Sequence, residues 1–220
     1  MSQDDAKRAA GEAAAALVET GMRVGLGSGS TATFFVLALV GRARRGFRFT
    51  CVATSEETAR LADVHGLDVG PLGRDGVDLA ADGADAVDRD LRLIKGAGGA
   101  HVREKIVAAA ARRFVVIVDD TKLHDVLAGA VPVEVLPYGA ERTLAQLEST
   151  GGRFRVRDRR SDNGNVLADG DYASLDDPEG LAAQVDAIPG VVGHGLFLGM
   201  TDLLIVGHAD GTVETREPSR

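Results

Sequence analysis

The sequence predicts an α/β protein, with a doubly wound, mostly parallel sheet of the Rossmann-like type and a second, smaller α+β domain of the ferredoxin-like type. Three observations lead to this prediction. Apolar runs of strand length alternate with helix-length segments through the first half of the chain. Glycine is frequent, at 28 of 220 residues, as in proteins with many strand–helix turns. Beyond residue 130 the order becomes strand, helix, strand, strand, helix, strand, which is the ferredoxin-like order.

The first part of the chain is predicted to consist of strand–helix units. We assign residues 1–129 and 200–220 to this catalytic α/β domain. A first helix, 4–20, ends at Gly21 as a C-cap. The strands predicted after it are 22–26, 47–53, 67–69, 77–81, 91–94 and 114–118. The helices predicted between them are 32–40, a helix that starts after Thr54 or Ser55 and ends at His65, and 100–112. Such alternation is typical of a doubly wound parallel sheet.

Residues 130–199 are predicted to form the smaller domain. Its strands are 132–137, 154–157, 165–168 and 191–197, and its helices are 139–150 and 176–187. A hairpin, 203–206 with 212–215, returns to the large domain. We interpret the charged stretch Arg157 to Arg160 as a solvated turn. We expect the small domain to provide the contact of a homodimer or homotetramer.

Composition limits the classes of function. The net charge is −8, so we expect no nucleic-acid partner, because phosphate backbones need a basic face. The single cysteine, Cys51, excludes an internal disulfide and is typical of a reducing compartment. No apolar run reaches membrane-spanning length and the first residues are acidic, unlike a secretory signal. We therefore expect a soluble, cytoplasmic protein without a membrane partner.

Chemistry-bearing side chains follow two predicted strands. Asp82 and Asp85 come directly after the run 77–81, and Lys95 with a glycine-rich loop comes after the run 91–94. The helix that follows this loop carries Glu104 in its first turns. Ligands of α/β sheets bind at the carboxyl ends of strands, so we expect these groups to converge. A carboxylate base, an ammonium group facing a developing oxyanion and carboxylates that hold hydroxyls suit proton abstraction beside a carbonyl.

Other interpretations of these residues remain. Glu104, between an arginine and a lysine, also fits an exposed ion-pair cluster on a helix. Asp82 and Asp85 would suit Mg²⁺, but no third carboxylate has helpful spacing. No histidine pair has zinc-ligand spacing with cysteines. We therefore expect no metal and no cofactor.

The loop Gly27-Ser28-Gly29-Ser30-Thr31 lies between the strand 22–26 and the helix 32–40. It is not a P-loop, because no Gly-Lys-Ser/Thr follows at the required spacing. As a dinucleotide fingerprint it puts Ser30 where Gly or Ala is expected, although Glu56 could bind a ribose. A monophosphate cradle fits best, because three hydroxyls join backbone N–H groups at a helix N-terminus. An ordinary strand–helix turn with a Ser/Thr cap is the other interpretation.

Lysine is rare. Of the 25 basic residues only four are lysine, at positions 7, 95, 105 and 122. In a chain that otherwise uses arginine, each lysine can mark a place that needs a compact point charge. Chance combined with a codon bias explains the same pattern.

Together these motifs resemble ribose-5-phosphate isomerase, type A. The matching pieces follow the family's order over nearly the whole chain: Gly27 to Thr31, Thr54-Ser55, Asp82 to Asp85, Lys95 to Gly98, Arg103 to Ile106, Asp119 to Lys122, Pro132 to Val135, Asp162 to Asn165, and Ile188 to Val192. The resemblance implies a metal-free aldose–ketose isomerase of the pentose phosphate pathway that interconverts ribose 5-phosphate and ribulose 5-phosphate through an enediolate.

The resemblance also assigns roles to residues. It implies that Glu104 is the proton acceptor. It implies that Asp82 and Asp85 bind sugar hydroxyls and assist ring opening, and that Lys95 lies beside the enediolate. The residues that it implies around the substrate and its phosphate are Lys7, Ser28, Gly29, Ser30, Thr31, Gly83, Ala84, Gly96, Ala97, Gly98 and Lys122.

This chain departs from the family pattern at three positions. Ser28 replaces a threonine and keeps the hydroxyl. Ala97 replaces a glycine, which would cost about 1 kcal/mol or more if this position needed a positive φ. His101 is unusual, and we interpret it as a partly exposed helix residue.

Two other functions use related folds. A non-catalytic sugar-phosphate sensor is disfavoured because no DNA-binding segment is present and Glu104 would be idle. An acyl-CoA transferase relative is disfavoured by the short chain and by the Asp82/Asp85 pair.

Overall fold

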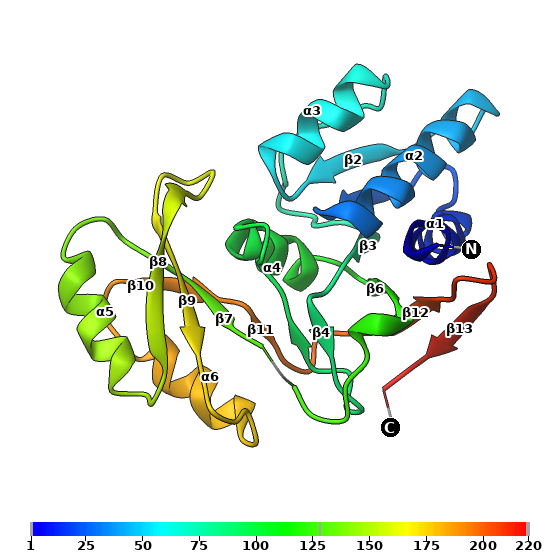
Figure 1. Ribbon diagram of the computed structural model, residues 1–220. Helices are drawn as coiled ribbons and strands as arrows, with labels where there is room; N and C mark the ends of the chain where they lie inside the picture. Colours follow the sequence, from blue (N-terminus) through cyan, green and yellow to red (C-terminus); the bar gives the residue numbers. More distant parts are fainter. Residues whose placement is uncertain (1, 128, 219–220) are drawn as a thin grey trace. The chain divides into compact units, whose positions relative to one another are not determined.

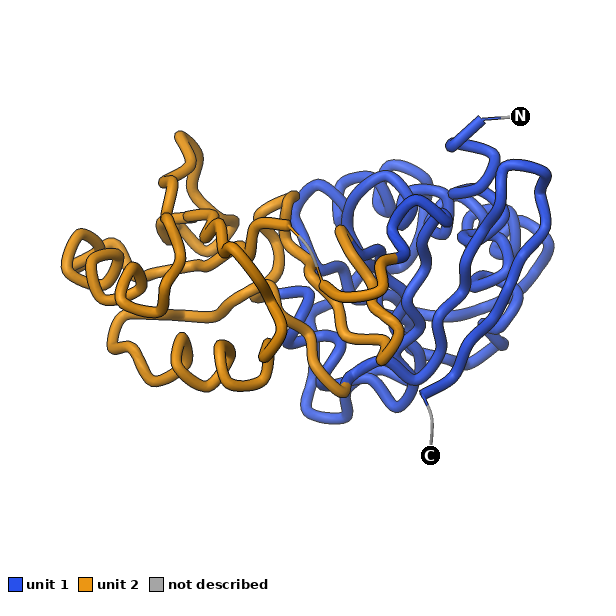
Figure 2. The backbone as a smooth tube through the Cα atoms, turned by 60° about the horizontal axis from the view of Figure 1, so that its bottom comes forward, with its two compact units in different colours: residues 1–84, 103–123, 200–220 blue, residues 85–102, 124–199 orange. Residues whose placement is uncertain are grey.

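The computed structural model describes residues 2–127 and 129–218, and the chain forms two compact units. Unit 1 consists of residues 1–84, 103–123 and 200–220, and unit 2 of residues 85–102 and 124–199 (Figure 2). No helix in the described ranges combines the length and the apolarity that crossing a membrane requires.

Unit 1 contains a six-stranded sheet in the order β13-β12-β6-β3-β1-β2 (Figure 1). Its strands are β1 (Arg23–Leu26), β2 (Thr50–Ala53), β3 (Leu79–Asp82), β6 (Phe114–Asp119), β12 (Leu203–Gly207) and β13 (Val213–Arg216). Its helices are α1 (Gln3–Ala16), α2 (Ser30–Arg44), α3 (Glu56–Val64) and the 3-10 helix η1 (Asp120–Lys122). All neighbours pair in parallel except β13, which is antiparallel to β12. The predicted mostly parallel sheet is confirmed.

Helices cover both faces of this sheet. The side chains of Val24 and Leu26 join a core with residues of α1 and α2. Gly25 lies between them in β1, so its missing side chain belongs to the opposite face. A Cβ there would lie 2.7 Å from a methyl group of Val107, which belongs to α4 (His101–Ala109). The glycine therefore lets α4 pack directly against the strand.

The first helix is fixed at both its start and its flank. Ser2 and Asp5 form a capping box that satisfies the first N–H groups of α1. The helix backbone then lies against β12, since a Cβ at Gly207 would come within 1.9 Å of the Ala6 carbonyl oxygen. Only glycine permits this approach, because any side chain would overlap the helix backbone.

Unit 2 contains a four-stranded antiparallel sheet in the order β10-β7-β9-β8. Along the chain its elements are β7 (Val131–Val135), α5 (Ala140–Glu148), β8 (Arg153–Arg160), β9 (Val166–Asp171), α6 (Pro178–Asp186) and β10 (Val191–His194). Val131, Val133 and Val135 alternate along β7 and share one core with Leu147 of α5 and Val185 of α6. The predicted ferredoxin-like order is therefore confirmed, with both helices on one face.

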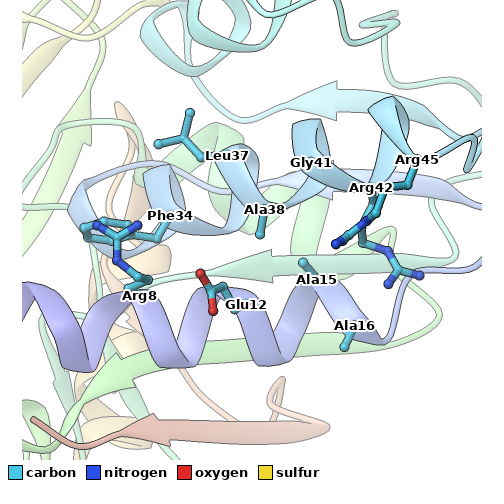
Figure 3. Close-up of a pocket in the computed structure, with 10 residues that line it drawn as sticks. All are labelled: Arg8, Glu12, Ala15, Ala16, Phe34, Leu37, Ala38, Gly41, Arg42 and Arg45. Carbon is cyan, nitrogen blue, oxygen red and sulfur yellow. The ribbon is translucent and has the colours of Figure 1, made fainter. Parts of the chain in front are cut away.

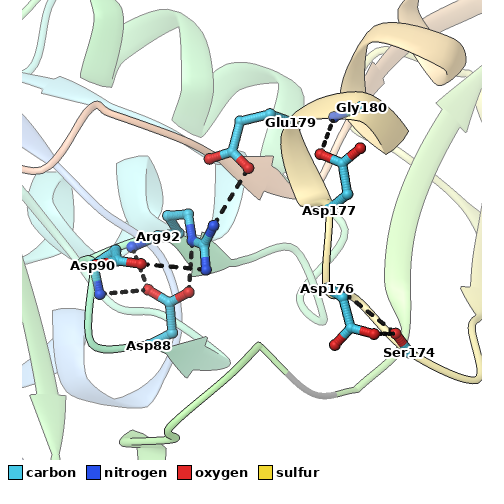
Figure 4. A network of polar contacts seen from close by, with 8 residues as sticks. All are labelled: Asp88, Asp90, Arg92, Ser174, Asp176, Asp177, Glu179 and Gly180. Carbon is cyan, nitrogen blue, oxygen red and sulfur yellow. Dashed lines mark hydrogen bonds and ion pairs between the residues drawn. The ribbon is translucent and has the colours of Figure 1, made fainter.

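A three-stranded antiparallel sheet, in the order β11-β5-β4, completes unit 2. Its strands are β4 (Ala86–Val87), β5 (Leu93–Ile94) and β11 (Leu196–Phe197). The run 91–94 was predicted as part of the parallel sheet, and this is wrong. Figure 4 shows the reason, because the Asp88 carboxylate binds the N–H groups of Asp90 and Arg92 and turns the chain back on itself. Leu91 takes a positive φ of 59° in this turn.

Three further predictions need correction. The first helix ends at Ala16 with Leu17 as its C-cap, and not at Gly21. The segment 67–69 is not a strand of the sheet but makes a single bridge, between Val69 and Cys51. Residues Arg157 to Arg160 are not a turn but the second half of β8, where the register shifts after Val156 and pairing with β9 resumes at Arg160, opposite Val166.

Candidate active site

The carboxyl ends of three neighbouring strands meet at one edge of the unit 1 sheet. Leu26 at the end of β1 lies beside Ala81, and Asp82 at the end of β3 lies beside Val116 of β6. β1 has β3 on one side and β2 on the other, so the connections reverse direction here. In open α/β sheets, ligands bind at this kind of reversal.

Asp82 is held firmly at this edge. Its side chain is 2% exposed, and its Oδ1 accepts hydrogen bonds from the backbone N–H groups of Ser28 (2.9 Å) and Gly83 (2.8 Å). A Cβ at Gly27 would lie 2.2 Å from the same oxygen. The glycine therefore permits the contact that joins the loop after β1 to the carboxylate after β3.

Hydroxyl groups at the end of β2 and the start of α3 hold the loop between β1 and α2 in place. The Ser28 hydroxyl lies 2.8 Å from that of Thr54 and donates to that of Ser55 at 2.8 Å. Thr58 donates to the Gly27 carbonyl at 3.0 Å. Thr54 and Ser55 belong to the predicted motifs, and Thr58 is a partner that sequence reasoning missed. The side chain of Ser28 is thus engaged within the loop's support.

Beyond Ser28 the loop presents the start of α2. Gly29 is the N-cap residue with a positive φ of 90°, and no side chain caps the helix there. Ser30 is exposed, and Thr31 is 8% exposed. The first N–H groups and the positive end of the helix dipole suit an anion such as phosphate.

Glu104 is a buried carboxylate, 5% exposed, in the first turn of α4. Val107, one turn later, packs over Gly25 and Ala80. The far end of α4 lies beside the start of β3, since the Val77 N–H donates to the Ala110 carbonyl at 3.0 Å. α4 therefore runs antiparallel to the strands, and Glu104 lies about 4.5 Å further toward their carboxyl ends. That is the level at which Asp82 ends β3.

Lys122 lies at the end of η1, directly after β6. Asp119 caps η1 through the backbone N–H of Thr121 (3.1 Å) and also accepts from Gln3 of α1 (3.3 Å). Burial acts to raise the pKa of Asp119, but the hydrogen bonds from Thr121 and Gln3 and the charge of Lys122 hold it below its ordinary value. Lys7 lies one helical turn after Gln3 and so shares its face of α1. The Gln3 contact thus brings the face of α1 that carries Lys7 toward η1, which ends in Lys122.

Unit 2 contains the remaining predicted residues, in a loop that we call the glycine loop (Lys95 to Gly99). Lys95 is 2% exposed, and its Nζ lies 5.4 Å from the centroid of the Phe197 ring, within cation–π range. Its backbone N–H donates to the Gly195 carbonyl at 2.8 Å. Ala97 N–H donates to Asp85 Oδ2 at 2.9 Å. Asp85 therefore holds the glycine loop in addition to its predicted role.

The two unusual residues near this loop have plain structural explanations. Leu91 is the one non-glycine residue with a positive φ in the described ranges, so Ala97 carries no such strain. His101 was interpreted as partly exposed, and this is wrong, because its side chain is fully buried. A Cβ at Gly96, where φ is 106°, would lie 2.7 Å from the His101 Cβ. The histidine thus packs against the loop backbone.

The turn between β4 and β5, which precedes the glycine loop, is stabilised by ion pairs. Arg92 donates to the buried Asp88 carboxylate at 2.7 Å and reaches Glu179 of α6 at 3.3 Å (Figure 4). No periodic pattern in the sequence predicts this contact between residues far apart along the chain. Its effect is to tie the β4–β5 hairpin to α6.

A groove of about 450 Å³ between α1 and α2 contains none of the predicted site residues. Figure 3 shows Arg8 against Phe34 at one end and Arg42 with Arg45 at the other. Arg8 stacks on Phe34, and Arg42 stacks on Phe47 and donates to the Val18 carbonyl at 2.6 Å. These arginines hold the helices together, so the groove is not our candidate active site.

In the described part of the chain, no group of three or more histidine, cysteine, aspartate or glutamate side chains is arranged to hold a metal ion. Unit 1 thus carries Lys7, Ser28 to Thr31, Asp82 to Ala84, Glu104 and Lys122, and unit 2 carries Asp85 and Lys95 to Gly98.

Comparison with known proteins gives one consistent result. Residues 50–211 match the family model described as ribose 5-phosphate isomerase A (phosphoriboisomerase A). The ribose-5-phosphate isomerase A of Thermomicrobium roseum is 48% identical, over 96% of this chain and 93% of that protein. The ribose 5-phosphate isomerase A structure from Methanocaldococcus jannaschii is 37% identical, with a TM-score of 0.92 over 98% of this chain and 100% of that one. A D-ribose-5-phosphate isomerase in complex with phospho-erythronic acid is 34% identical, with a TM-score of 0.94 over 99% of this chain and 100% of that one.

Proposed function

The chain belongs to the ribose 5-phosphate isomerase A family, and we propose that it interconverts ribose 5-phosphate and ribulose 5-phosphate through an enediolate, with Glu104 as the base. The observation that carries the assignment of the base is the burial of the Glu104 carboxylate in the first turn of α4, the helix that packs against Gly25 of β1. An exposed ion-pair residue would not need this burial. The 34% identical relative, a D-ribose-5-phosphate isomerase in complex with phospho-erythronic acid, supports a sugar phosphate as the substrate.

The first step is proton removal from carbon. In the open-chain aldose, the Glu104 carboxylate takes the proton from C2. The C2–H electron pair forms the C1–C2 double bond, and the carbonyl electrons move to O1, which becomes the enediolate oxygen. The carboxylic acid then returns the proton to C1. O2 loses its proton as the C2 carbonyl forms, O1 gains one, and the product is the ketose. One carboxylate serves both steps, because both carbons can be reached from the same side.

Negative charge that develops on the enediolate oxygen needs a positive partner. We assign this role to the Lys95 ammonium group, which is buried beside the Phe197 ring. The backbone N–H groups of the glycine loop join it, because fixed donors stabilise an oxyanion without reorganising during the reaction. Asp82 and Asp85 accept hydrogen bonds from sugar hydroxyls and assist ring opening. Gly83 and Ala84 line this part of the site.

The phosphate is assigned to the start of α2 and to lysine side chains. Gly29, Ser30 and Thr31 offer N–H groups and hydroxyls, and Lys122 and Lys7 offer charge at the neighbouring strand end. The Ser28 hydroxyl supports the loop from below. Gly96, Ala97 and Gly98 contact the sugar from the glycine loop. Binding energy from this remote phosphate orients the reacting end of the sugar.

We also propose a role for each domain and an oligomeric assembly. Residues 1–129 with 200–220 carry out catalysis, and residues 130–199 provide the contact of a homodimer or homotetramer. Light scattering after size-exclusion chromatography tests the assembly, and a monomer at assay concentration would contradict it. The cytoplasmic location and the absence of nucleic-acid and membrane partners remain predictions.

The central test is an isomerase assay with ribose 5-phosphate, run with and without EDTA. Conversion in both conditions supports the proposal. A protein that binds the sugar phosphate without converting it would be a sensor. Transfer of CoA between acyl groups, with no isomerisation, would make it a transferase relative.

A further inference from the structure

The glycine loop turns three consecutive carbonyl groups toward β8. Arg157 Nη1 donates to the carbonyls of Gly96 (3.1 Å) and Ala97 (2.9 Å). Arg159 Nη2 donates to the carbonyl of Gly98 at 2.6 Å. Two guanidinium groups on one strand therefore bind the backbone of the loop that carries Lys95.

Arg157 is itself fixed by a carboxylate. Its Nε and Nη2 donate to the two oxygens of Asp169 on β9, at 2.8 and 2.5 Å, which is a bidentate pair. The Arg157 side chain is 15% exposed and that of Asp169 is 28% exposed. The Nε and Nη2 atoms of the planar Arg157 guanidinium group thus bind Asp169, and its Nη1 atom binds the loop. Lysine cannot make this arrangement, because its ammonium group is a point donor.

The glycine loop depends on these restraints on the side that faces β8. Gly96 and Gly99 have positive φ values of 106° and 77°, and glycine backbones are the most free to change conformation. A cavity of about 400 Å³ borders Ala97 and Arg157 within unit 2, so close packing does not restrain the loop on that side. There, hydrogen bonds from charged side chains hold the loop backbone.

The restraints also fix where the loop's N–H groups point. A trans peptide unit points its C=O and N–H in opposite directions. The Gly96–Ala97 unit is held at both ends, with its carbonyl on Arg157 and its N–H on Asp85. In the next unit the Ala97 carbonyl points to Arg157, so the Gly98 N–H points away from β8. A flip of this unit would replace that donor by a carbonyl oxygen, which repels an oxyanion.

We propose that Arg157, oriented by Asp169, and Arg159 are positioning residues that hold the glycine loop in the conformation that presents Lys95 and the Gly98 N–H to the enediolate. This inference rests on the proposed function of the loop. It also replaces the interpretation of residues 157–160 as a solvated turn.

The test uses variants of the full chain. R157A and R157K should each lower kcat by about 10²-fold, the scale of a catalytic group displaced by 1 Å, with a small change in KM. R159A should lower kcat by about 10-fold, the lower range for losing a hydrogen bond from a charged group. R155A is the matched control on the same strand. Arg155 is exposed and lies opposite Asp169 in the strand pairing, so its variant should match wild type.

Amide hydrogen exchange separates a local effect on the glycine loop from a general loss of stability. In R157A and R159A the amides of residues 96–99 should exchange faster, while those of β7 and β9 keep wild-type rates. If R157A does not fold, R159A still tests the proposal, because Arg159 is exposed on β8 and its replacement should not prevent folding. Wild-type kcat and wild-type loop exchange in R159A would overturn the proposal, as would full rescue of kcat by R157K. An inactive wild-type protein would refute the proposed function, whereas loop exchange would still test the restraint.

Discussion

Replacing Glu104 by Gln removes a base while keeping the size and shape of the side chain. Glu104 is 5% exposed, so solvent has little access to substitute for the lost carboxylate. Loss of a positioned general base lowers kcat by about 10²–10⁴-fold. At 1.36 kcal/mol per tenfold, this is about 2.7–5.4 kcal/mol of barrier. KM should change little, because the proposed role of Glu104 is proton transfer and not substrate binding.

The same variant separates chemistry from stability. The unfolding midpoint of E104Q, compared with that of wild type, shows whether the variant keeps the fold. The matched control is E57Q, since Glu57 is an exposed glutamate in the first turn of α3. In D₂O, NMR follows deuterium exchange into the sugar along with turnover, and both should be lost together in E104Q. Near-wild-type turnover, or a large drop of the midpoint in step with kcat, would refute Glu104 as the base.

Three further predictions follow from the same site. K95M should lower kcat by about 10²-fold or more, the scale of one lost oxyanion donor, and wild-type turnover should survive exhaustive chelation; loss with EDTA and recovery with Mg²⁺ or Mn²⁺ would instead make Asp82 and Asp85 metal ligands. K122A, or Ser30 and Thr31 both changed to Ala, should mainly raise KM for ribose 5-phosphate, and equal kcat/KM for ribose and its phosphate would contradict the phosphate site. Because the pKa of Asp119 is lower in the folded chain, its contribution to stability is complete above its ordinary value and is lost as pH falls through the lowered one. Acid titrations of unfolding should therefore show a smaller loss for D119N than for wild type below about pH 4, and parallel curves would contradict the role of Asp119.

The unit 1 sheet and the edge where its strands end could be predicted because each strand is indicated by a short pattern of neighbouring residues. The central strands of unit 1 are short apolar runs, and some of the predicted site residues lie at or just after their ends, as Asp82 does at the end of β3. The rule that parallel strands end at one edge then brings Ser28, Asp82 and Lys122 to neighbouring strand ends. Helix starts were also readable, since Ser55 caps α3 as predicted from its type and position.

The remaining features depend on contacts between distant residues, which leave no periodic trace. Arg157 lies about 60 positions from the carbonyls that it binds, and an alternating run of arginines looks the same whether it faces solvent or a loop. His101 is buried because Gly96 takes a positive φ that makes room for it, and glycine alone does not reveal its φ. The β4–β5 reversal depends on a buried carboxylate, Asp88, that the sequence presents as one more charged turn residue.

The contact between Ala6 and Gly207 has a consequence for how the protein is made. A ribosome releases the chain from its N-terminus, so α1 is complete long before β12 is synthesised. Until residue 207 has emerged, one side of α1 has no strand to rest on, and all of unit 2 must be translated in between. The side of α1 that carries Ala6 therefore reaches its final packing only at the end of synthesis. A nascent chain cut short before β12 should leave this side of α1 uncovered, although β6 is already available to the rest of the helix.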